Sequence, residues 1–320
     1  MSVAAPVEIE RPESAEENLV VPTVQMVFRR SQQNVLSRDD YFSAAAHPAA
    51  FERFNLNLAR MVSLANSIRP GDIPPQVKIR MVEEELGVEG VDYFGEGLSE
   101  QLFDTPAAIA RIWRSRAGRR AMLVSAEETA DPNGRPLAFE WRLLQGDPAR
   151  VRITPQDDGR RARIEIDWHE PFPISEDNPV RSARVDIGVF ANNGVHDSAP
   201  AILSMAFPTH ETRSYAPGPE GAPRIASIDH ADPAKAETYA DPMLMARAGW
   251  RDDYAYTPDG SPLGWTRTRG TRTEAFTPEG ERIVARAPDG TPLTLEPVTY
   301  PLRRDAEGRL TVEEIAAPRP

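Results

Sequence analysis

The stretch Leu137-Ala-Phe-Glu-Trp-Arg-Leu-Leu144 decides the fold class of this chain. Its large apolar side chains fall on every second residue, so Leu137, Phe139, Trp141 and Leu143 share one face of an extended strand. Such a face requires a partner sheet that covers it from the other side. The stretch therefore predicts a strand in the core of a β-sandwich.

Similar short runs flank this strand on both sides. The runs that predict strands are Ala121–Ala126, Val151–Thr154, Ala162–Trp168, Ala183–Ala191 and Ala199–Phe207. Turn sequences separate them: Pro132-Asn133-Gly134, Gly146-Asp147-Pro148, Asp157-Asp158-Gly159 and Asn192-Asn193-Gly194. This density of short strands and turns predicts an immunoglobulin-like β-sandwich over residues 118–210.

A small mixed α/β region is expected before the sandwich, over residues 21–117. The pattern predicts strands over Val21–Arg30 and Val77–Val82, and helices within Asp39–Phe54 and Leu56–Ile68. A further short helix is expected from Asp104-Thr105-Pro106, where an acidic or hydroxyl cap precedes a proline. Residues 1–20 are acidic and aperiodic, and we expect a disordered leader.

The C-terminal region, residues 211–320, is expected to be a meander of β-hairpins. Acidic residues precede glycine at Asp259-Gly260, Glu279-Gly280, Asp289-Gly290 and Glu307-Gly308, and apolar residues follow shortly after each pair. Ile225–Asp229 predicts another strand, and a helical excursion is expected within Pro233–Ala248. The predicted fold class is therefore mainly β.

Composition excludes several classes of function. The net charge of −12 argues against binding to nucleic acid, which needs a basic face, and against docking on anionic membranes. No apolar run is long enough to predict membrane insertion. The chain has no cysteine, which excludes disulfides and thiolate chemistry, and its 31 prolines indicate short elements joined by many loops.

The N-terminus does not resemble a secretion signal. Residues 1–18 contain five glutamates and no apolar core segment, so a signal peptide is not expected in this sequence. Two interpretations stay open: the chain acts in the cytoplasm, or it is the mature or excised part of a periplasmic or extracellular protein.

One segment resembles a known family. Asp131-Pro-Asn-Gly-Arg-Pro-Leu-Ala-Phe-Glu-Trp141, followed by Leu144-Gln-Gly-Asp-Pro148, is similar to the PKD-type and related cadherin-like modules of bacterial exported proteins. The resemblance covers residues 118–210 and implies an immunoglobulin-like sandwich in an exported bacterial protein. The sequence departs from the family pattern at Asn133, where a second carboxylate is expected, and in a longer loop at Ser175–Pro179.

Three residues are candidates for a metal site. Asp131, Asn133 and Asp197 lie in loops that are expected to share one end of the sandwich. Hard oxygen ligands suit Ca²⁺, and the resemblance implies that some relatives bind it. The alternative is that Asp131 and Asn133 only build an Asx-type turn.

Signs of catalysis are sparse. The sequence has no phosphate-binding glycine loop, no HExxH and no GxSxG element. An enzyme is the less favoured interpretation: a metal-dependent hydrolase would build its site from His169, His210, His230 and nearby carboxylates. Consecutive acids such as Asp252-Asp253 and Glu313-Glu314 are expected on exposed faces.

The favoured hypothesis is a non-enzymatic binding or structural module. Its ligand, a glycan or a protein, would contact the loops Pro132–Gly134 and Asn192–Asp197, or a set of four aromatic residues. These are Trp250, Tyr254, Tyr256 and Trp265, whose alternative role is to form the core of the hairpin meander. A scaffold subunit of a larger assembly is a further alternative.

Overall fold

The computed structural model describes residues 20–48, 53–175, 178–221, 223–230, 232–235 and 245–317. The chain divides into two compact units. The first unit comprises Met1–Glu84, Leu102–Arg111 and Ala121–Met205, and the second comprises Glu85–Gln101, Ile112–Arg120 and Ala206–Pro320. The stretch 21–117, expected as one region, therefore contributes to both units.

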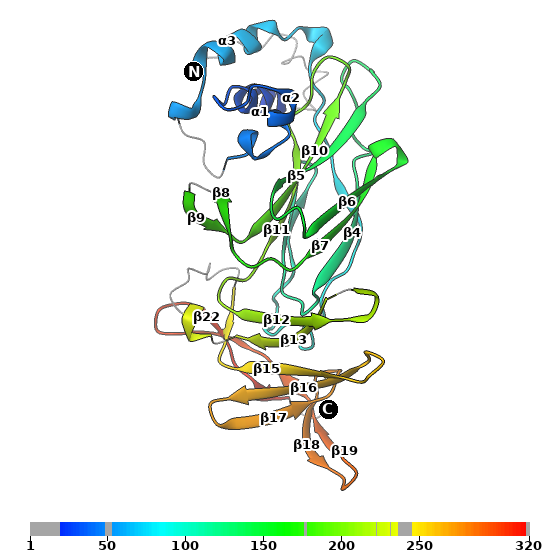
Figure 1. Ribbon diagram of the computed structural model, residues 1–320, viewed down its shortest axis with the longest axis vertical. Helices are drawn as coiled ribbons and strands as arrows, with labels where there is room; N and C mark the ends of the chain where they lie inside the picture. The colour runs from blue at the N-terminus through cyan, green and yellow to red at the C-terminus, as the bar shows by residue number, and fades with distance from the viewer. Residues whose placement is uncertain are drawn as a thin grey trace. The chain divides into compact units, whose positions relative to one another are not determined.

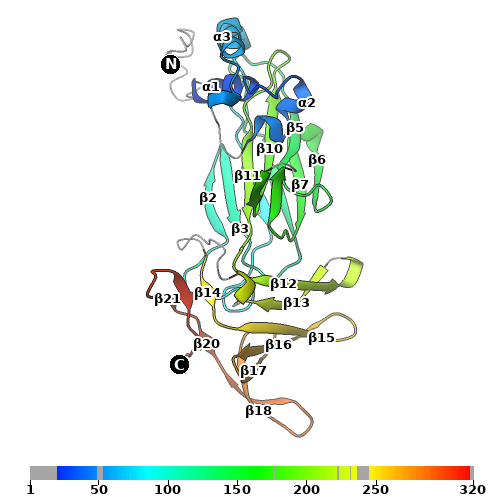
Figure 2. The ribbon, with the colours of Figure 1, turned by 60° about the vertical axis from the view of Figure 1, so that its left-hand side comes forward.

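The first unit contains the predicted sandwich of two sheets (Figures 1 and 2). One sheet has the order β1-β4-β7-β6, formed by Arg80–Glu84, Arg119–Ser125, Arg161–Asp167 and Val151–Gln156. The other has the order β2-β3-β11-β10-β5, formed by Gln101–Thr105, Ala108–Ile112, Ala201–Ala206, Arg184–Asn192 and Ala138–Gln145. Strands β1, β4, β7 and β6 match the A-B-E-D sheet of an immunoglobulin domain, and β11, β10 and β5 match its G-F-C sheet. The immunoglobulin-like fold is thus confirmed by topology.

Alternating apolar residues from both sheets form the sandwich core. Ile164 and Ile166 of β7 and Val189 of β10 are fully buried. Trp141 of β5 is 7 % exposed, and its indole N–H donates to the Gly159 carbonyl at 2.7 Å. The period-two pattern in the sequence therefore identified the faces that the two sheets bury against each other.

The prediction of a strand over Val21–Arg30 is wrong, because Val20–Arg30 is helix α1. Its buried residues, Pro22, Thr23, Met26 and Val27, recur at helical spacing. Proline is tolerated here because it lies in the first turn, where its missing N–H is not needed. Met26 and Val27 of this helix belong to one core cluster with Leu144 and Phe190 of the sheet.

Two further helices accompany α1 in the first unit. They are α2 (Arg38–Tyr41) and α3 (Leu58–Ser67), with short 3₁₀ turns at Ala44–Ala46, Arg53–Asn55 and Pro70–Asp72. The expected helix within Leu56–Ile68 is confirmed, whereas only short helical turns form in the described part of Asp39–Phe54. Strand β10 is buried on both faces, because the sheet β1-β4-β7-β6 covers one face and the helices cover the other.

The prediction of a helix at Asp104-Thr105-Pro106 is also wrong. This segment is the turn of a hairpin between β2 and β3, in which the Thr105 hydroxyl donates to the Ala108 carbonyl at 3.0 Å. Ile109 and Ile112 are buried, as are the residues between them, so the segment lacks the exposed face of a surface helix. The described ends of the inserted loop at Ser175–Pro179 lie in another pair of antiparallel strands, β8 (Phe172–Ser175) and β9 (Asn178–Ser182).

The second unit is built on a seven-stranded sheet. Its strands in spatial order are β12 (Thr212–Pro217), β13 (Pro223–Asp229), β15 (Arg251–Tyr256), β16 (Pro262–Arg269), β17 (Arg272–Phe276), β18 (Arg282–Arg286) and β19 (Pro292–Glu296). A smaller sheet has the order β14-β22-β21, formed by Arg247–Ala248, Leu310–Val312 and Leu302–Arg304. Another sheet pairs β20 (Val298–Thr299) with β23 (Ile315–Ala316). The predicted hairpin meander is present.

All four acidic-glycine pairs lie in hairpin turns, as predicted. Gly260, Gly280, Gly290 and Gly308 each have a positive φ, between 80° and 94°, which glycine adopts without strain. In each turn the glycine N–H donates to the carbonyl three residues earlier at 2.9–3.1 Å. The strand at Ile225–Asp229 is confirmed as part of β13, whereas Pro233–Ala248 contains only a 3₁₀ turn and β14 among its described residues.

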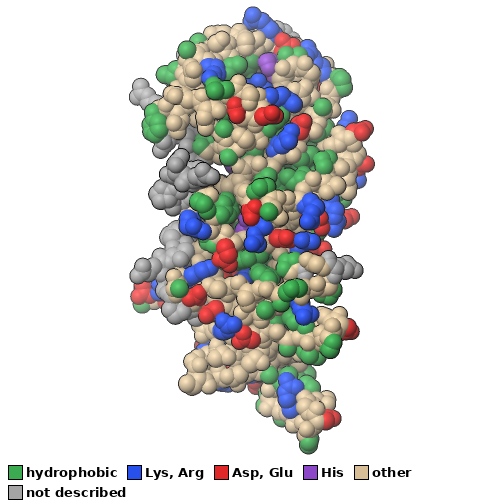
Figure 3. Space-filling model, in the orientation of Figure 1, with side chains coloured by type: hydrophobic (Ala, Val, Ile, Leu, Met, Phe, Trp, Pro, Cys, Tyr) green, Lys and Arg blue, Asp and Glu red, His purple; other side chains and the backbone are tan. Residues whose placement is uncertain are grey.

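Charged side chains of both signs are interspersed on the face shown in Figure 3. Among the helices that the structure describes, none combines the length and the apolar character needed to cross a membrane. Residues 1–19 of the expected leader lie outside the described residues.

Candidate functional site

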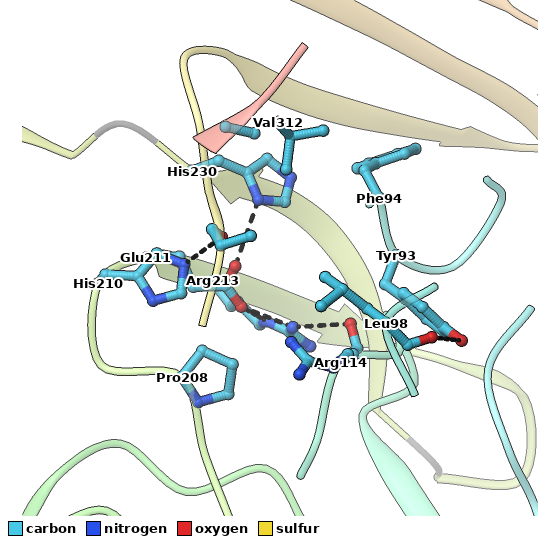
Figure 4. A pocket seen from close by; sticks show the side chains of 12 residues that line it. Tyr93, Phe94, Leu98, Arg114, Pro208, His210, Glu211, Arg213, His230 and Val312 are labelled. Atoms are coloured by element: carbon cyan, nitrogen blue, oxygen red, sulfur yellow. Dashed lines mark hydrogen bonds and ion pairs between the residues drawn. The ribbon is translucent and has the colours of Figure 1, made fainter. Parts of the chain in front are cut away.

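Two adjoining hollows in the second unit share a wall of two histidines. An inner hollow of about 40 Å³ and an outer one of about 450 Å³ are both lined by His210, His230, Ala248 and Val312. In Figure 4, the two histidines lie on one side of the inner hollow, and Phe94 lies on the other. These two histidines are titratable side chains that border both hollows, so this wall is the candidate site.

The β-structure of the unit positions this wall. His210 precedes β12 and His230 directly follows β13, so the antiparallel pairing of these two strands brings the histidines to the same end. The backbone N–H of His230 donates to the Trp250 carbonyl at 3.0 Å. The parallel pairing of β14 with β22 places Ala248 opposite Val312 and completes the wall.

His230 is held between two carboxylates. Its Nδ1 lies 3.2 Å from Glu211 Oε2, and its Nε2 lies 3.6 Å from Asp252 Oδ2. Burial by itself would lower the pKa of His230, but the adjacent carboxylates of Asp252 and Glu211 outweigh burial and raise the pKa above its ordinary value. The geometry therefore favours the imidazolium form.

His210 has the opposite preference. Its Nε2 lies 3.1 Å from the Ala246 carbonyl, which can only accept, so Nε2 carries the proton and Nδ1 is a free lone pair. That Nδ1 is buried and finds no hydrogen-bond partner in the described part of the chain. Burial lowers the pKa of His210, and the neighbouring charge of His230 lowers it further. The wall thus pairs a neutral imidazole with a charged one.

Further ion pairs extend from this wall into the core. The Glu211 carboxylate accepts a hydrogen bond from Arg213 Nε at 2.6 Å, and Arg213 holds the pKa of that carboxyl far below its usual range despite burial. Asp252 accepts two hydrogen bonds of 2.8 Å each from Arg267, which also pairs with Glu314. All of these side chains are at most 6 % exposed. Such fully paired charges fix the histidine wall rigidly.

The titration of His230 predicts a pH effect on stability. The folded state binds this proton more tightly than the unfolded chain does, so the stabilisation is complete below the ordinary histidine pKa of about 6.5 and is lost as the pH rises through the raised value. We expect wild-type stability to fall over that range by at most about 1.4 kcal/mol per pH unit. His230→Gln should remove this slope in urea unfolding followed from about pH 6 to 9.

His169→Gln is the matched control for this experiment. His169 belongs to the first unit and its pKa is lowered, chiefly by burial, so its replacement should leave the alkaline slope intact. An unchanged slope in His230→Gln would contradict the assignment.

The structure separates the three histidines of the predicted hydrolase site into the two units. His210 and His230 share the wall described above, whereas His169 lies in the first unit. There, His169 Nδ1 donates to the Asp167 carbonyl at 2.8 Å, and its Nε2 accepts from the Asp147 N–H at 3.1 Å. His169 is therefore engaged with its own sandwich loops.

The two candidate calcium-binding carboxylates are engaged by protein donors, and the Asn133 side chain donates to the Pro70 carbonyl at 3.2 Å. Asp131 accepts from the Asn133 N–H at 2.8 Å, as an Asx-type turn requires, and from the Asn193 side chain at 2.9 Å. Asp197 accepts from Arg30 at 3.0 Å and Arg38 at 2.9 Å. Within the described ranges, no three His, Asp or Glu side chains are arranged to hold a metal ion together. Calcium binding by Asp131, Asn133 and Asp197 stays a prediction.

The four candidate ligand-binding aromatics lie in or near the core of the second unit. Trp250 and Trp265 are each 2 % exposed and belong to a cluster with Phe94, and Tyr254 packs against that cluster. Tyr256 is partly buried, and its hydroxyl donates to the Ile225 carbonyl at 3.0 Å. The two tryptophans therefore act as core residues, and a role of the four rings in ligand binding stays a prediction.

The sequence reasoning missed the buried carboxylates. Asp252-Asp253 and Glu313-Glu314 were expected on exposed faces, but Asp252 and Glu314 are at most 1 % exposed, whereas Asp253 and Glu313 are 50 % and 53 % exposed. Adjacent residues of an extended chain point to opposite sides, so one acid of each pair faces inward. The strand period was the signal that could have found them.

Comparison with known proteins gives only remote similarities. No protein-family model matches the chain, and no curated protein matches it. A nucleoside hydrolase-related hypothetical protein from Saccharophagus degradans, associated with carbohydrate metabolism, aligns at 13 % identity and a TM-score of 0.25, over 47 % of this chain. The chain covers 29 % of that protein's length.

Immunoglobulin-like structures are also found. The tandem Ig repeats of Dlar align at 15 % identity, and the N-terminal Ig1-2 module of the Drosophila receptor protein tyrosine phosphatase DLAR aligns at 11 % identity. Both have a TM-score of 0.19 and are aligned over 62 % of this chain and 94 % of their own.

Proposed function

We propose that this chain is a non-enzymatic binding module of an exported bacterial protein, and that the outer hollow of the second unit binds a neutral glycan. The observation that carries the proposal is the set of polar groups around this hollow. Besides the histidine wall, its lining comprises Asp232, Arg247, Gly249, Asp305, Arg309 and Thr311. Its volume of about 450 Å³ falls in the range of small-molecule sites.

The charges around the hollow favour a neutral ligand. The carboxylates of Asp232 and Asp305 balance the guanidinium groups of Arg247 and Arg309. The charge of His230 is compensated on its other side by Glu211 and Asp252. Without an excess of either sign, the site offers no net attraction to an ion.

The same groups suit the hydroxyls of a sugar. Carboxylates accept hydrogen bonds, guanidinium groups donate them, and a hydroxyl does both. The Nδ1 lone pair of His210 adds a buried acceptor to the wall. A ligand that presents several hydroxyls can satisfy donors and acceptors of this kind at once.

The same proposal also assigns the sandwich of the first unit to a family of modules. The resemblance of residues 118–210 to PKD-type and cadherin-like modules supports the proposal that the sandwich is a module of a bacterial exported protein. The same resemblance supports the proposal of a periplasmic or extracellular location. In this proposal the sandwich is a structural module, and the second unit carries the glycan site.

A glycan array tests the proposal, followed by calorimetry with the best neutral oligosaccharide. Asp305→Asn should weaken its binding by roughly 10- to 100-fold, because a charged acceptor of the lining is lost. Asp289→Asn is the matched control: Asp289 also accepts a turn N–H, from Thr291 at 3.0 Å, but it does not line the hollow. An array without neutral hits, or equal effects of the two variants, would refute glycan binding at this site.

A hydrolase is the second candidate, favoured by the opposite pKa shifts of His210 and His230. In that case His210 Nδ1 acts as general base and His230 as general acid, since environments that push two pKa values apart assign acid and base roles. Turnover in a substrate screen that is abolished by His210→Gln would support this candidate. Stoichiometric transition metal in the purified protein would favour its metal-dependent form.

A further inference from the structure

A separate hollow of about 490 Å³ lies in the first unit, beside the loop that joins β10 to β11. Helices α1, α2 and α3 also contribute to it. Its lining comprises Arg30, Val35, Leu36, Ser37, Arg38, Tyr41, Arg60, Leu64, Asn192, Val195 and Asp197. Within an immunoglobulin-like sandwich this is the F–G loop, one of the loops that such folds use for recognition.

The lining has an excess of positive charge. Three arginines, Arg30, Arg38 and Arg60, face this hollow with a single carboxylate, that of Asp197. The pKa of His196, in the same loop, is lowered by burial and is lowered further by the positive charge of Arg30. The hollow therefore attracts an anionic group, unlike the balanced hollow of the second unit.

Two of the arginines already form a carboxylate clamp. Arg38 binds Asp197 through Nε at 3.1 Å and Nη2 at 2.9 Å, and Arg30 Nη2 binds the same carboxylate at 3.0 Å. Their guanidinium planes are supported by aromatic rings, Arg30 over Tyr41 at 4.7 Å and Arg38 over Phe42 at 4.6 Å. Such support pre-organises the donors.

The clamp retains donor capacity after it has bound Asp197. A guanidinium group has five N–H donors, and a single carboxylate engages only some of those in each arginine. The Nε of Arg30 is buried and has no hydrogen-bond partner among the described residues. Arg60, by contrast, is a structural group, since its Nη1 donates to the carbonyls of Gln32 and Val35.

Apolar side chains also line the hollow. Val35 is buried, whereas Leu36 and Val195 are 78 % and 47 % exposed. Exposed apolar residues beside a cationic clamp match a ligand that has an anionic head and an apolar body.

We propose that this hollow binds a carboxylate attached to an apolar group, with Arg38 and Arg30 as the recognition residues. The carboxylate shares the arginine donors with Asp197, and the apolar group contacts Leu36 and Val195. The free C-terminus of a peptide that ends in leucine and a short fatty acid both have this chemistry.

Calorimetric titration of the full chain tests the proposal. The probes are N-acetyl-leucine, octanoate and N-acetyl-leucinamide, in which an amide replaces the carboxylate. We expect at least one of the two acids to bind with a Kd on the order of 1 mM or tighter, and the amide to bind at least about tenfold more weakly. The stronger of the two acids identifies the source, peptide terminus or fatty acid.

Variants assign the binding to the clamp. Arg38→Gln should weaken binding of the acid at least about tenfold, and Arg38→Lys should have an intermediate effect, because lysine keeps the charge but not the bidentate fork. Arg152→Gln is the matched control, an arginine of β6 that is 59 % exposed and paired with Glu165 at 3.1 Å. Thermal melting verifies that each variant is folded.

Binding of neither acid would overturn the proposal, as would equal binding of acid and amide. An unchanged affinity in folded Arg38→Gln would overturn it as well. Loss of glycan binding at the second unit would not affect this outcome, since the two hollows share no residue.

Discussion

Replacement of Arg267 by methionine is expected to lower the free energy of unfolding by about 3–5 kcal/mol. The Arg267 side chain is fully buried and binds Asp252 through two hydrogen bonds, and it also pairs with Glu314. Without its guanidinium group, both buried carboxylates would lose their closest counter-charge. Among the described residues, Asp252 would keep only His230 at 3.6 Å, and Glu314 only the longer pairs with Arg269 at 3.5 Å and Arg282 at 3.4 Å, so burial of these charges would be poorly offset. Urea unfolding at neutral pH measures the change.

Aromatic rings add to this expectation. They surround the Arg267 guanidinium carbon, with ring centroids 4.1 Å away in Trp250, 4.3 Å in Phe94 and 4.8 Å in Phe276. These rings belong to the core of the unit, so the guanidinium group is shielded from water. Cation–π interactions are stronger in such a desolvated environment than at the surface.

Arg251→Met is the matched control on the neighbouring strand. Arg251 pairs with Asp253 at 2.9 Å, but both side chains are about half exposed, so the loss should be about 1 kcal/mol or less. Asp252→Asn in the Arg267→Met background should recover part of the stability, since it removes one of the two buried carboxylates that lost Arg267 as their closest partner. Equal losses in the two single arginine variants would refute the role of the buried network.

Replacement of Phe190 by alanine is expected to cost about 3–5 kcal/mol in the first unit. Phe190 is 2 % exposed and joins β10 to the helices, with ring centroids 4.6 Å from Phe42 and 5.6 Å from Tyr41. Its removal leaves a cavity between two layers that cannot both relax into it. Thermal and urea unfolding measure the loss.

Phe103→Ala controls for the loss of a phenyl ring. Phe103 lies on β2 of the same sheet and is 52 % exposed, so its removal should cost below about 1 kcal/mol. If Phe190→Ala lost no more than Phe103→Ala, the helices would not be anchored through this ring.

Much of the β-structure could be predicted from local sequence. Alternation identified β5, β6, β7 and β10, and the acidic-glycine pairs identified four hairpin turns. These features depend on neighbours within a few residues, because strand period and turn conformation are local properties. The helix at Val20–Arg30 was mistaken for a strand because a short apolar run fits both periods.

The candidate sites were predictable only in part. His210 and His230 were named as candidates, but their separation from His169 depends on which unit each segment joins. Arg267 of β16 pairs with Asp252 of β15. Counting the strand register back from the Asp259-Gly260 turn would give Asp252 a different partner, because the register shifts between Ala255 and Tyr256. Pairing across that irregularity cannot be read from residue order.

Local sequence patterns suffice to predict a mainly β chain with an immunoglobulin-like sandwich followed by hairpins, because alternating side chains and turn residues act over short distances. Which charged residues pair with each other depends instead on how distant segments pack. Arg267 reaches Glu314 across 47 residues, and Arg38 reaches Asp197 across 159 residues. Ion pairs and hollows of this kind arise where distant strands and loops are packed together, so their chemistry belongs to the fold.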